Sequence, residues 1–552
     1  MSFVDIQSDE KPSALTKDPN WWRGAVIYQI YPRSFQDSNG DGIGDLQGII
    51  ERLPHVASLG VDAIWISPFF KSPMLDYGYD VSDYCDVDPM FGTMGDFDRL
   101  IERAHDLGIR IIIDLVLSHT SDKHPWFVES RVSRDNAKAD WYVWADAKPD
   151  GTPPNNWLSI FGGSAWEWDT SRMQYYLHNF LREQPDLNFH NMDVQDAVLD
   201  VARFWLERGV DGFRLDTVNF YVHDKELRDN PAVPDDQKNS DIAPSVNPYT
   251  WQEHRYSKSQ PENIVFLEKL RRVMDEFPDI TSVGEVGDDQ KGLQIQAEYT
   301  EGTERLHMCY GFDFLSAPFP TGTRVAAILN RFQDMAAESW ACWAYSNHDV
   351  IRHTTRWELS AEAQKAYLAL LMSMRGSVCL YQGEELGLTE AEVAFEDLQD
   401  PYGIQFWPKF KGRDGCRTPM TWSSNAQNGG FSAGKPWLPV SSEHAAMSVD
   451  SQQADPGSML NFYRRMIAFR RAHAALQQGG LVITEATDSH LAFIRDHDGK
   501  RMFCAFNLSD AAMTLRLPDG VWHLDDSAPF TAEQSTDGVH LAAWQVVFAR
   551  EG

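Results

Sequence analysis

Carboxylates and histidines follow several short apolar runs of this sequence. GFRLD ends in Asp216, TSVGE in Glu285, and WAYSNHD in His348 and Asp349; IRIIIDLVLSH contains Asp114 and ends in His119. One such residue after a buried strand is often merely solvated. Several carboxylates on one rim repel each other, so they persist where a cation, a metal or a reaction uses them. The repeated pattern therefore predicts a functional site formed by these carboxylates and histidines.

The sequence favours acid–base and nucleophilic chemistry by carboxylates. It has no His/Cys cluster with zinc spacing and no HExxH, P-loop or GxSxG pattern. Glycoside cleavage is the best-known use of paired carboxylates. Arg214 lies two residues before Asp216 on the same strand face, so we expect its cation to keep Asp216 ionised as a nucleophile. Glu285, in an apolar run, suits a general acid with a raised pKa.

Eight apolar, β-branched runs with interleaved helical patterns must position these residues. This alternation predicts a (β/α)₈ barrel, whose strands present catalytic residues at their C-terminal ends. An open doubly wound sheet would need a glycine-rich phosphate turn after the first strand, where the acidic DSNGDGIGD stands instead. The runs are Val26 to Ile30, Ala63 to Ile66, Ile109 to Leu115, Gly212 to Leu215, Ile280 to Val283, Met308 to Phe312, Trp343 to Tyr345 and Ser377 to Tyr381.

The spacing between strands predicts additions to a plain barrel. We expect barrel segments at 1–119 and 186–475, separated by an inserted domain at 120–185, with a further insertion at about 388–450. A closing helix is predicted from Met459 to Leu476. Beyond it, at 476–552, strand-length alternation and Asp-Gly turns predict a small antiparallel β domain.

Composition excludes several classes of partner. The 552 residues carry 81 acidic and 49 basic side chains, a net charge of −32, which argues against nucleic acid and anionic membranes. No run of 18 apolar residues occurs, and the N-terminus lacks the pattern of a secretion signal. Six scattered cysteines without a CxxC pair are typical of a reducing compartment. We therefore expect a cytoplasmic protein with a neutral or cationic substrate.

Seven motifs, in order, resemble the conserved regions of the α-amylase family of glycoside hydrolases. Its α-glucosidase and oligo-1,6-glucosidase branch is the most similar in QPDLN and in the stretch RDGCRTPMTW. The motifs are AVIYQIYPRSFQDSNGDGIGDLQGI, the Asp114 to His119 segment, QPDLN, GFRLD, VGEV, SNHD and YQGEELG.

The resemblance implies a (β/α)₈ barrel with an inserted B domain and a C-terminal β-sandwich, and double displacement with retention of the α-anomer. It implies that Asp216 is the nucleophile, Glu285 the acid/base and Asp349 the transition-state stabiliser. Asp76 and Arg413 would pair at the floor of a pocket for the terminal glucose, which makes the enzyme exo-acting. The implied pocket residues are Asp76, Tyr79, His119, Arg214, His348 and Arg413, with Phe161 and Gln184 as weaker candidates.

Two positions are informative about which branch of the family this chain resembles. Many family members carry Asn where this chain has Ser118, which we interpret as branch variation. Thr217, directly after the nucleophile, is a residue that in similar enzymes accompanies preference for α-1,4 linkages, as in maltose and sucrose-type substrates. The alternatives left open are an oligo-1,6-glucosidase, and a transferase or isomerase such as sucrose isomerase or trehalose synthase. Non-catalytic transporter subunits with this fold have lost the catalytic carboxylates, which this chain keeps.

The acidic loop after the first predicted strand supplies oxygen ligands at alternating positions, as a hard cation requires. Its start is similar to an EF-hand, but the twelfth position is Gly48 and not Glu. The loop also resembles the structural calcium or magnesium site of this enzyme branch, and the alternative is a polar turn without metal. The implied ligands are the side chains of Asp37, Asn39, Asp41 and Asp45 and the carbonyl of Ile43.

Overall fold

Eight parallel strands form the centre of the molecule in the computed structural model, which describes residues 15, 17–234, 243–288, 290–536 and 538–552. All eight predicted runs form strands, with ends shifted by at most three residues. The N-terminal stretch on which the absence of a secretion signal was judged lies largely outside the described residues. The strands are β1 Val26–Ile30, β2 Ala63–Ile66, β5 Arg110–Leu115, β9 Gly212–Leu215, β10 Thr281–Val286, β11 Met308–Gly311, β12 Cys342–Ala344 and β13 Ser377–Tyr381.

These strands close into a barrel. Their order is β11-β10-β9-β5-β2-β1-β13-β12, and every neighbouring pair is parallel. A parallel bridge between Cys309 and Ala341 joins the two edges. The (β/α)₈ fold is thereby confirmed, and the C-terminal ends of all eight strands meet on one rim.

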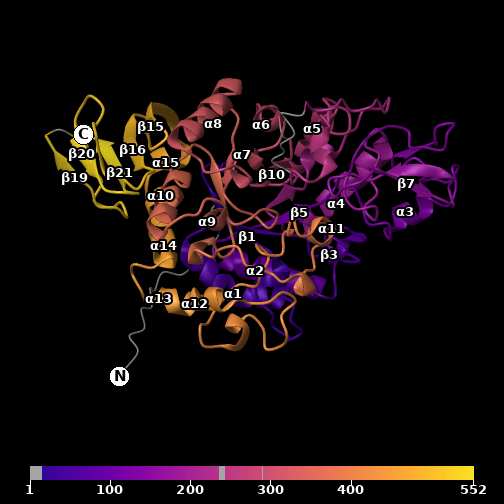
Figure 1. Ribbon diagram of the computed structural model, residues 1–552, viewed down its shortest axis with the longest axis horizontal. Helices are drawn as coiled ribbons and strands as arrows, with labels where there is room; N and C mark the ends of the chain where they lie inside the picture. Colours follow the sequence, from indigo (N-terminus) through magenta and orange to yellow (C-terminus); the bar gives the residue numbers. More distant parts are fainter. Residues whose placement is uncertain (1–14, 16, 235–242, 289, 537) are drawn as a thin grey trace.

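Helices surround the barrel, and most connect consecutive strands (Figure 1). The helix α4 begins at Met192, where the side chain of Asn191 accepts a hydrogen bond from the amide of Asp193. The predicted closing helix is two helices, α14 and α15, because His473 between them has an extended backbone. The main helices are α1 Leu46–Leu59, α2 Met94–Asp106, α4 Met192–Glu207, α5 Asn263–Met274, α6 Gly292–Tyr299, α8 Gly322–Met335, α10 Ala361–Leu371, α14 Met459–Ala472 and α15 Ala474–Gln478.

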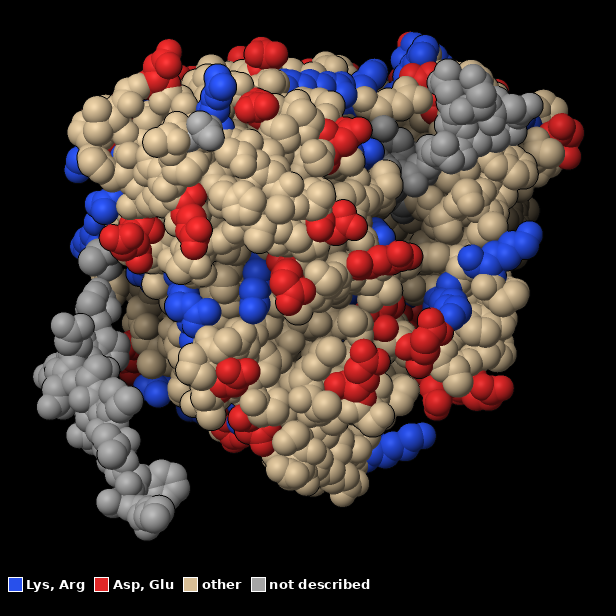
Figure 2. Space-filling model, turned by 60° about the vertical axis from the view of Figure 1, so that its left-hand side comes forward, with Lys and Arg blue, Asp and Glu red and all other residues tan. Residues whose placement is uncertain are grey.

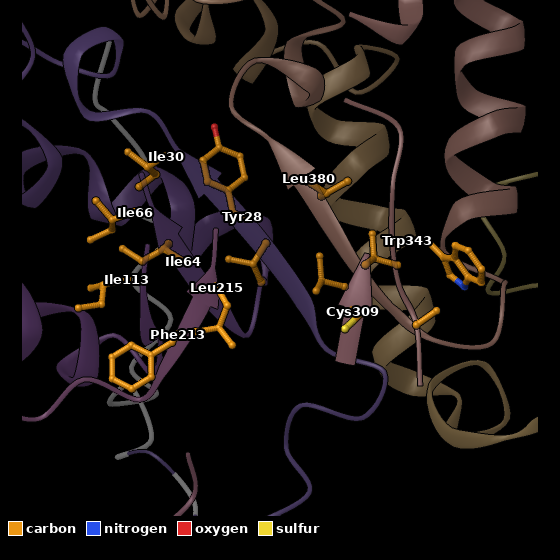
Figure 3. Packing of buried hydrophobic residues seen from close by; sticks show 14 of the residues in the cluster. Tyr28, Ile30, Ile64, Ile66, Ile113, Phe213, Leu215, Cys309, Trp343 and Leu380 are labelled. Carbon is orange, nitrogen blue, oxygen red and sulfur yellow. The ribbon is translucent and has the colours of Figure 1, made fainter. Parts of the chain in front are cut away.

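The period of two along each strand separates two apolar layers. Side chains such as Ile64, Ile113 and Phe213 belong to the large outer cluster that packs under the helices (Figure 3). Their neighbours Ile112 and Trp65 belong to a smaller cluster, which fills the inside of the barrel. Arg214 alternates with Phe213 and Leu215, so its side chain is directed into the barrel.

Two insertions interrupt the barrel. Residues 120–185 contain the short helix α3 Pro125–Ser130 and an antiparallel sheet in the order β6-β8-β7 (Figure 1). The sheet strands are β6 Trp144–Ala145, β7 Trp166–Asp169 and β8 Gln174–Leu177. The segment 388–450 contains α11 Pro401–Phe406 and α12 Ser442–Ala446, and α13 Val449–Gln453 begins at its end. The segment between α11 and α12 supplies residues to the site described below.

The C-terminal part, yellow in Figure 1, is a β-sandwich. Antiparallel sheets in the orders β14-β15-β16-β21-β18 and β17-β20-β19 enclose a separate apolar cluster that includes Phe503 and Val539. The strands are β14 Gly480–Ala486, β15 His490–His497, β16 Lys500–Asn507, β17 Met513–Leu515, β18 Trp522–Leu524, β19 Glu533–Ser535, β20 Gly538–Leu541 and β21 Val546–Glu551. The predicted antiparallel domain is thereby confirmed.

Acidic and basic side chains are spread over the face shown in Figure 2. All six cysteines are free, and all but Cys85 are buried. Among the described residues, no helix combines the length and apolar character needed to cross a membrane.

Candidate active site

Arg214 lies at the centre of a cluster of three buried carboxylates from neighbouring strands. Its Nη1 is 2.8 Å from Asp114 Oδ1 and 2.5 Å from Asp216 Oδ1, and its Nη2 is 2.6 Å from Glu285 Oε1. Arg214 is fully buried. The inward positions of β5, β9 and β10 place these residues together, as the sequence predicts, because parallel strands end on one rim.

Tyr310, the second inward residue of β11, completes this cluster. Its hydroxyl accepts hydrogen bonds from Arg214 Nε at 3.1 Å and Nη2 at 2.8 Å, and donates to Glu285 Oε1 at 3.0 Å. Glu285 Oε1 is therefore held as an acceptor by two donors. This leaves Oε2 as the oxygen that can carry the proton of a general acid.

Both Asp216 and Glu285 have a raised pKa, whereas the sequence predicts a raised pKa for Glu285 only. Burial raises the pKa of Glu285 to about 7, against the charge of Arg214, as a general acid requires. Burial also raises the pKa of Asp216 to about 7, with the charge of Asp114 adding to it. The expected ion pair of Arg214 with Asp216 is present, and its charge opposes the effect of burial, but three carboxylates share that one cation and the pKa of Asp216 is still raised. The Asp216–Glu285 pair instead holds a proton near neutral pH.

Asp349 has the opposite character. Although burial opposes it, the neighbouring His348, Arg413 and Arg417 lower the pKa of Asp349 far below its usual range. Arg417 Nη2 lies 2.9 Å and Arg413 Nη1 3.2 Å from Asp349 Oδ1. Asp349 is therefore ionised throughout the working range of an enzyme.

His348 is oriented by a chain of hydrogen bonds inside the barrel. Gln29 Nε2 donates to His348 Nδ1 at 2.7 Å, which leaves the proton of the imidazole on Nε2. That nitrogen lies 2.6 Å from the hydroxyl of Tyr79, which in turn donates to Asp114 Oδ2 at 3.0 Å. The rings of Tyr79 and His348 are stacked, with centroids 5.4 Å apart.

The floor of the site is an ion-pair network around Arg413. Its Nη2 is 2.9 Å from both Asp76 Oδ1 and Asp400 Oδ1. Gln184 Nε2 donates to Asp76 Oδ2 at 3.1 Å, and the guanidinium lies 5.1 Å from the ring centroid of Phe161. The predicted pairing of Asp76 with Arg413 is present, and both residues line the cavity described below.

Ser118, His119 and Thr217 form a bridge beside the nucleophile candidate. Ser118 Oγ is 2.8 Å from His119 Nδ1 and 3.2 Å from Thr217 Oγ1. The Thr217 hydroxyl is also 3.2 Å from Asp216 Oδ2, and its amide donates to Glu285 Oε2 at 3.2 Å. Thr217 makes these contacts in the left-handed region, with φ 40° and ψ 48°, which is strained for a β-branched residue.

A cavity of about 350 Å³ opens onto these groups. Asp76, Tyr79, His119, Phe161, Asp216, Thr217, Glu285, Asp349 and Arg413 all line it. The other candidates, Gln184, Arg214 and His348, lie behind this wall and hold its members by the contacts described above. The structure thus brings all twelve predicted catalytic and sugar-binding residues to one place. The rest of the cavity is lined mainly by apolar side chains: Ile160, Phe180, Phe220, Ala243, Pro244, Phe312, Leu315, Val350, Ile351 and Phe410.

Three residues of the site were not singled out from the sequence. Tyr310 ends an inward-facing alternation that period two on β11 would have identified. Arg417 stands in the RDGCRTPMTW stretch, four residues after Arg413. Asp400 carries no local signal, because its role follows from the return of a long insertion to the barrel rim.

The acidic loop lies apart from this cavity and is ordered by its own side chains. Asp37 Oδ1 accepts from the amide of Asn39 at 2.9 Å, Asn39 Oδ1 from Asp41 at 2.9 Å, and Asp41 Oδ1 from Ile43 at 2.8 Å. Asp45 caps helix α1 through the amide of Gly48. Within the described part of the chain, no group of three or more His, Cys, Asp or Glu side chains is gathered as metal ligands. A cation in this loop would therefore need Asn39 and the Ile43 carbonyl as well.

Comparison with known proteins identifies relatives over nearly the whole chain. A probable alpha-glucosidase of Rhizobium meliloti is 62% identical over 542 residues, which cover 98% of each chain. An oligo-1,6-glucosidase of Heyndrickxia coagulans is 37% identical and covers 91% of this chain and 95% of its own. The crystal structure of an alpha-glucosyl transfer enzyme is 54% identical and superposes with a TM-score of 0.94, covering 96% of this chain and 99% of its own.

The family model for the alpha-amylase catalytic domain matches residues 29–479, which include the end of β1 and the other seven strands of the barrel. This match, the barrel and the carboxylates on its rim agree with one another. The chain is a glycoside hydrolase that belongs to the alpha-amylase family.

Proposed function

We propose that this enzyme is an exo-acting α-glucosidase that removes terminal, non-reducing α-glucosyl residues with retention of configuration. The observation that carries the proposal is the ion-pair network of Arg413 with Asp76 and Asp400, whose members Asp76 and Arg413 line the same cavity as the Asp216–Glu285 pair and would form its floor. A pocket closed behind one sugar subsite accepts a chain end and excludes the middle of a polysaccharide. Apolar walls with a few convergent polar groups are also typical of small-ligand sites.

Retention is supported by the way one guanidinium holds both reacting carboxylates. Asp216 and Glu285 contact neighbouring nitrogens of Arg214. This favours the separation of about 5–5.5 Å of retaining enzymes over the roughly 6.5–9.5 Å that an inverting enzyme needs for its water.

The mechanism follows from which oxygens are occupied. Asp216 Oδ1 is bound to Arg214, so Oδ2 forms the bond to the anomeric carbon, while the bond to the leaving oxygen breaks and that oxygen takes the proton of Glu285. Water then attacks the same carbon, gives its proton to Glu285, and Asp216 Oδ2 leaves. Asp349, kept ionised by two arginines, stabilises the positive charge that develops on the sugar in both steps.

The position of Thr217 supports a preference for α-1,4 linkages, as in maltose, with sucrose as a further candidate. The competing activity is that of an oligo-1,6-glucosidase. Kinetics on maltose, isomaltose, sucrose and kojibiose separate the two, with NMR detection of the anomer first released. We expect kcat/KM to be highest for maltose and the first product to be α-glucose; preference for isomaltose would favour the alternative, and β-glucose would overturn retention.

Transfer to a second hydroxyl is a further proposed activity of the same glucosyl-enzyme. It is supported by the 54% identity with an alpha-glucosyl transfer enzyme and by the apolar side chains that line much of the cavity, which are a poor environment for ordered water. Product chromatography at high sugar concentration tests it. Transfer products would appear alongside glucose, and isomerised sucrose would instead indicate a sucrose isomerase.

We also propose that the loop from Asp37 to Asp45 binds a structural calcium or magnesium ion. Its all-oxygen donor set fits a hard cation, and its alternating side chains already fold the loop back on itself. Asp37, Asn39, Asp41, Asp45 and the Ile43 carbonyl would hold the ion. It would stabilise the connection between β1 and α1 and take no part in the chemistry.

A cytoplasmic location is proposed on the six free cysteines, which are typical of proteins in a reducing compartment. The net charge of −32 supports a small neutral sugar over nucleic acid as the partner.

A further inference from the structure

Thr217 contacts both carboxylates of the proposed reaction, and its hydroxyl has two neighbours at the same distance. Asp216 Oδ2 and Ser118 Oγ each lie 3.2 Å from Thr217 Oγ1. A hydroxyl carries one proton, so Thr217 donates to one of them at a time. Which one it uses depends on where the proton of Ser118 lies.

The proton of Ser118 is committed to His119. His119 Nε2 lies 3.0 Å from the carbonyl oxygen of Tyr79, which can only accept, and 3.2 Å from Gln184 Nε2, which also donates to Asp76. The shorter contact, to the carbonyl oxygen, favours the imidazole proton on Nε2. The opposite tautomer would point a lone pair of Nε2 at that carbonyl. Nδ1 is then an acceptor, and Ser118 Oγ donates to it at 2.8 Å. Towards Thr217, the Ser118 oxygen therefore presents lone pairs.

The occupied oxygens make this arrangement relevant to the reaction. Asp216 Oδ1 is held by Arg214, so the oxygen beside Thr217 is the one that attacks the sugar. A hydrogen bond to an attacking oxygen lowers its nucleophilicity, and it must weaken as that oxygen becomes part of an ester. Ser118 and His119 are buried, whereas Thr217 is half-buried on the cavity wall, so Ser118 is the acceptor that the protein itself supplies to the Thr217 hydroxyl.

We propose that Ser118 is a positioning residue that accepts the Thr217 hydroxyl when Asp216 attacks, and so frees the nucleophilic oxygen for bond formation. When water later displaces Asp216, the Thr217 hydroxyl returns to Oδ2 and stabilises the carboxylate as it leaves. Ser118 thus assists the first step and is not needed in the second. This inference rests on the proposed function, with Asp216 as nucleophile.

The test is a double-mutant cycle between Ser118→Ala and Thr217→Val. Ser118→Ala should lower kcat/KM for nitrophenyl α-glucoside, which reports the first step, by roughly fivefold, the size of one net hydrogen bond. The same variant should not slow the second step, and it could accelerate that step. The second step is measured as kcat on a dinitrophenyl glucoside, because the first step is fast with that substrate. A general loss of structure would slow both steps equally.

Thr217→Val removes the hydroxyl and keeps the shape of the side chain. In this background Ser118→Ala should change the first step by less than twofold, since the remaining effect comes from the contact with His119. With Thr217 in place, Ser118→Thr keeps the hydroxyl that Ser118→Ala removes, so it should leave the first step at the wild-type rate. An equal effect of Ser118→Ala in both backgrounds would overturn the inference. Failure of the proposed function is distinguishable, because the wild-type enzyme would then show no α-glucosidase activity.

Discussion

Two arginines in this molecule each bind three carboxylates, yet the two clusters differ in charge. Arg214 contacts Asp114, Asp216 and Glu285, and among the described residues no second Lys or Arg forms an ion pair with any of them. Burial raises the pKa of Asp114 to about 6 and those of Asp216 and Glu285 to about 7.

At the pocket floor, Arg413 contacts Asp76, Asp349 and Asp400, and Arg417 adds a second cation on Asp349. There the pKa values of Asp349 and Asp400 are lowered despite burial, and only that of Asp76 is raised. The number of cations therefore separates a cluster that can move a proton from one that holds fixed charge.

The largest effect is expected from removing the nucleophile of the single-arginine cluster. Asp216→Ala should lower kcat/KM for nitrophenyl α-glucoside by at least about 10⁴-fold, because the covalent step is lost. Asp114→Asn, which keeps the shape of its side chain, is the matched control and should cost less. Near-wild-type activity of Asp216→Ala would exclude the assignment.

A smaller effect is expected from removing one of the two cations at the pocket floor, which leaves a single arginine there as in the catalytic cluster. Arg417→Met leaves Arg413 as the cation of three carboxylates, so the pKa of Asp349 should rise. Loss of one charge-assisted hydrogen bond corresponds to about 10- to 100-fold in kcat/KM. The acid limb of the pH profile should stay in place, because the Asp216–Glu285 pair sets it near pH 7, well above the pH at which Asp349 takes up a proton. A kcat/KM equal to that of the wild type would show that Arg413 alone suffices.

The wild-type pH profile tests the catalytic cluster directly. The Asp216–Glu285 pair works with one proton, and burial raises both pKa values to about 7. As pH rises above about 7 the acid is lost, and as pH falls below it the nucleophile becomes protonated. We expect kcat/KM between pH 4 and 10 to be bell-shaped with a maximum near 7. A plateau extending down to pH 4 would contradict a shared proton.

The same raised pKa of Asp216 predicts a modest dependence of stability on pH. The folded protein keeps a proton that the unfolded chain has released between about pH 4 and 7, so this group's contribution to the unfolding free energy falls as pH rises through that window. Asp216→Asn removes this loss. Its Tm should exceed that of the wild type by on the order of 2 °C at pH 8 and by less at pH 5, measured by calorimetry. An equal shift at both pH values would point to packing.

The acidic loop sharpens the comparison, because its three aspartates form no ion pair with an arginine among the described residues. If a cation supplies the charge there, dialysis against a chelator should lower Tm, and calcium should restore it. At a metal concentration of 100 Kd the stabilisation is about 2.7 kcal/mol. Asp41→Ala, on the exposed side of the loop, should abolish the response to calcium while leaving kcat within about twofold of wild type.

The fold was largely predictable because its signals are local. Each predicted strand, such as Ile109 to Leu115, is an apolar run at strand length. Asp216 and Glu285 stand at the ends of two other such runs, and finding them there needs no tertiary information. The break between α14 and α15 at His473 was not predicted, since Ala472 and Ala474 on either side are good helix formers. His473 instead lies 3.0 Å from Asp525 of the β-sandwich.

The sequence by itself determined the eight strands, the carboxylates at their ends and the motifs that the alpha-amylase family shares. Those properties depend on residue types at fixed short spacings. The tertiary structure decided how many cations each carboxylate meets. Arg413, Arg417 and Asp400 reach the site from a long insertion, and Asp114 and Glu285 share Arg214 across three strands. Protonation depends on these distances and on burial, so it could not be judged from Arg214 and Asp216 alone.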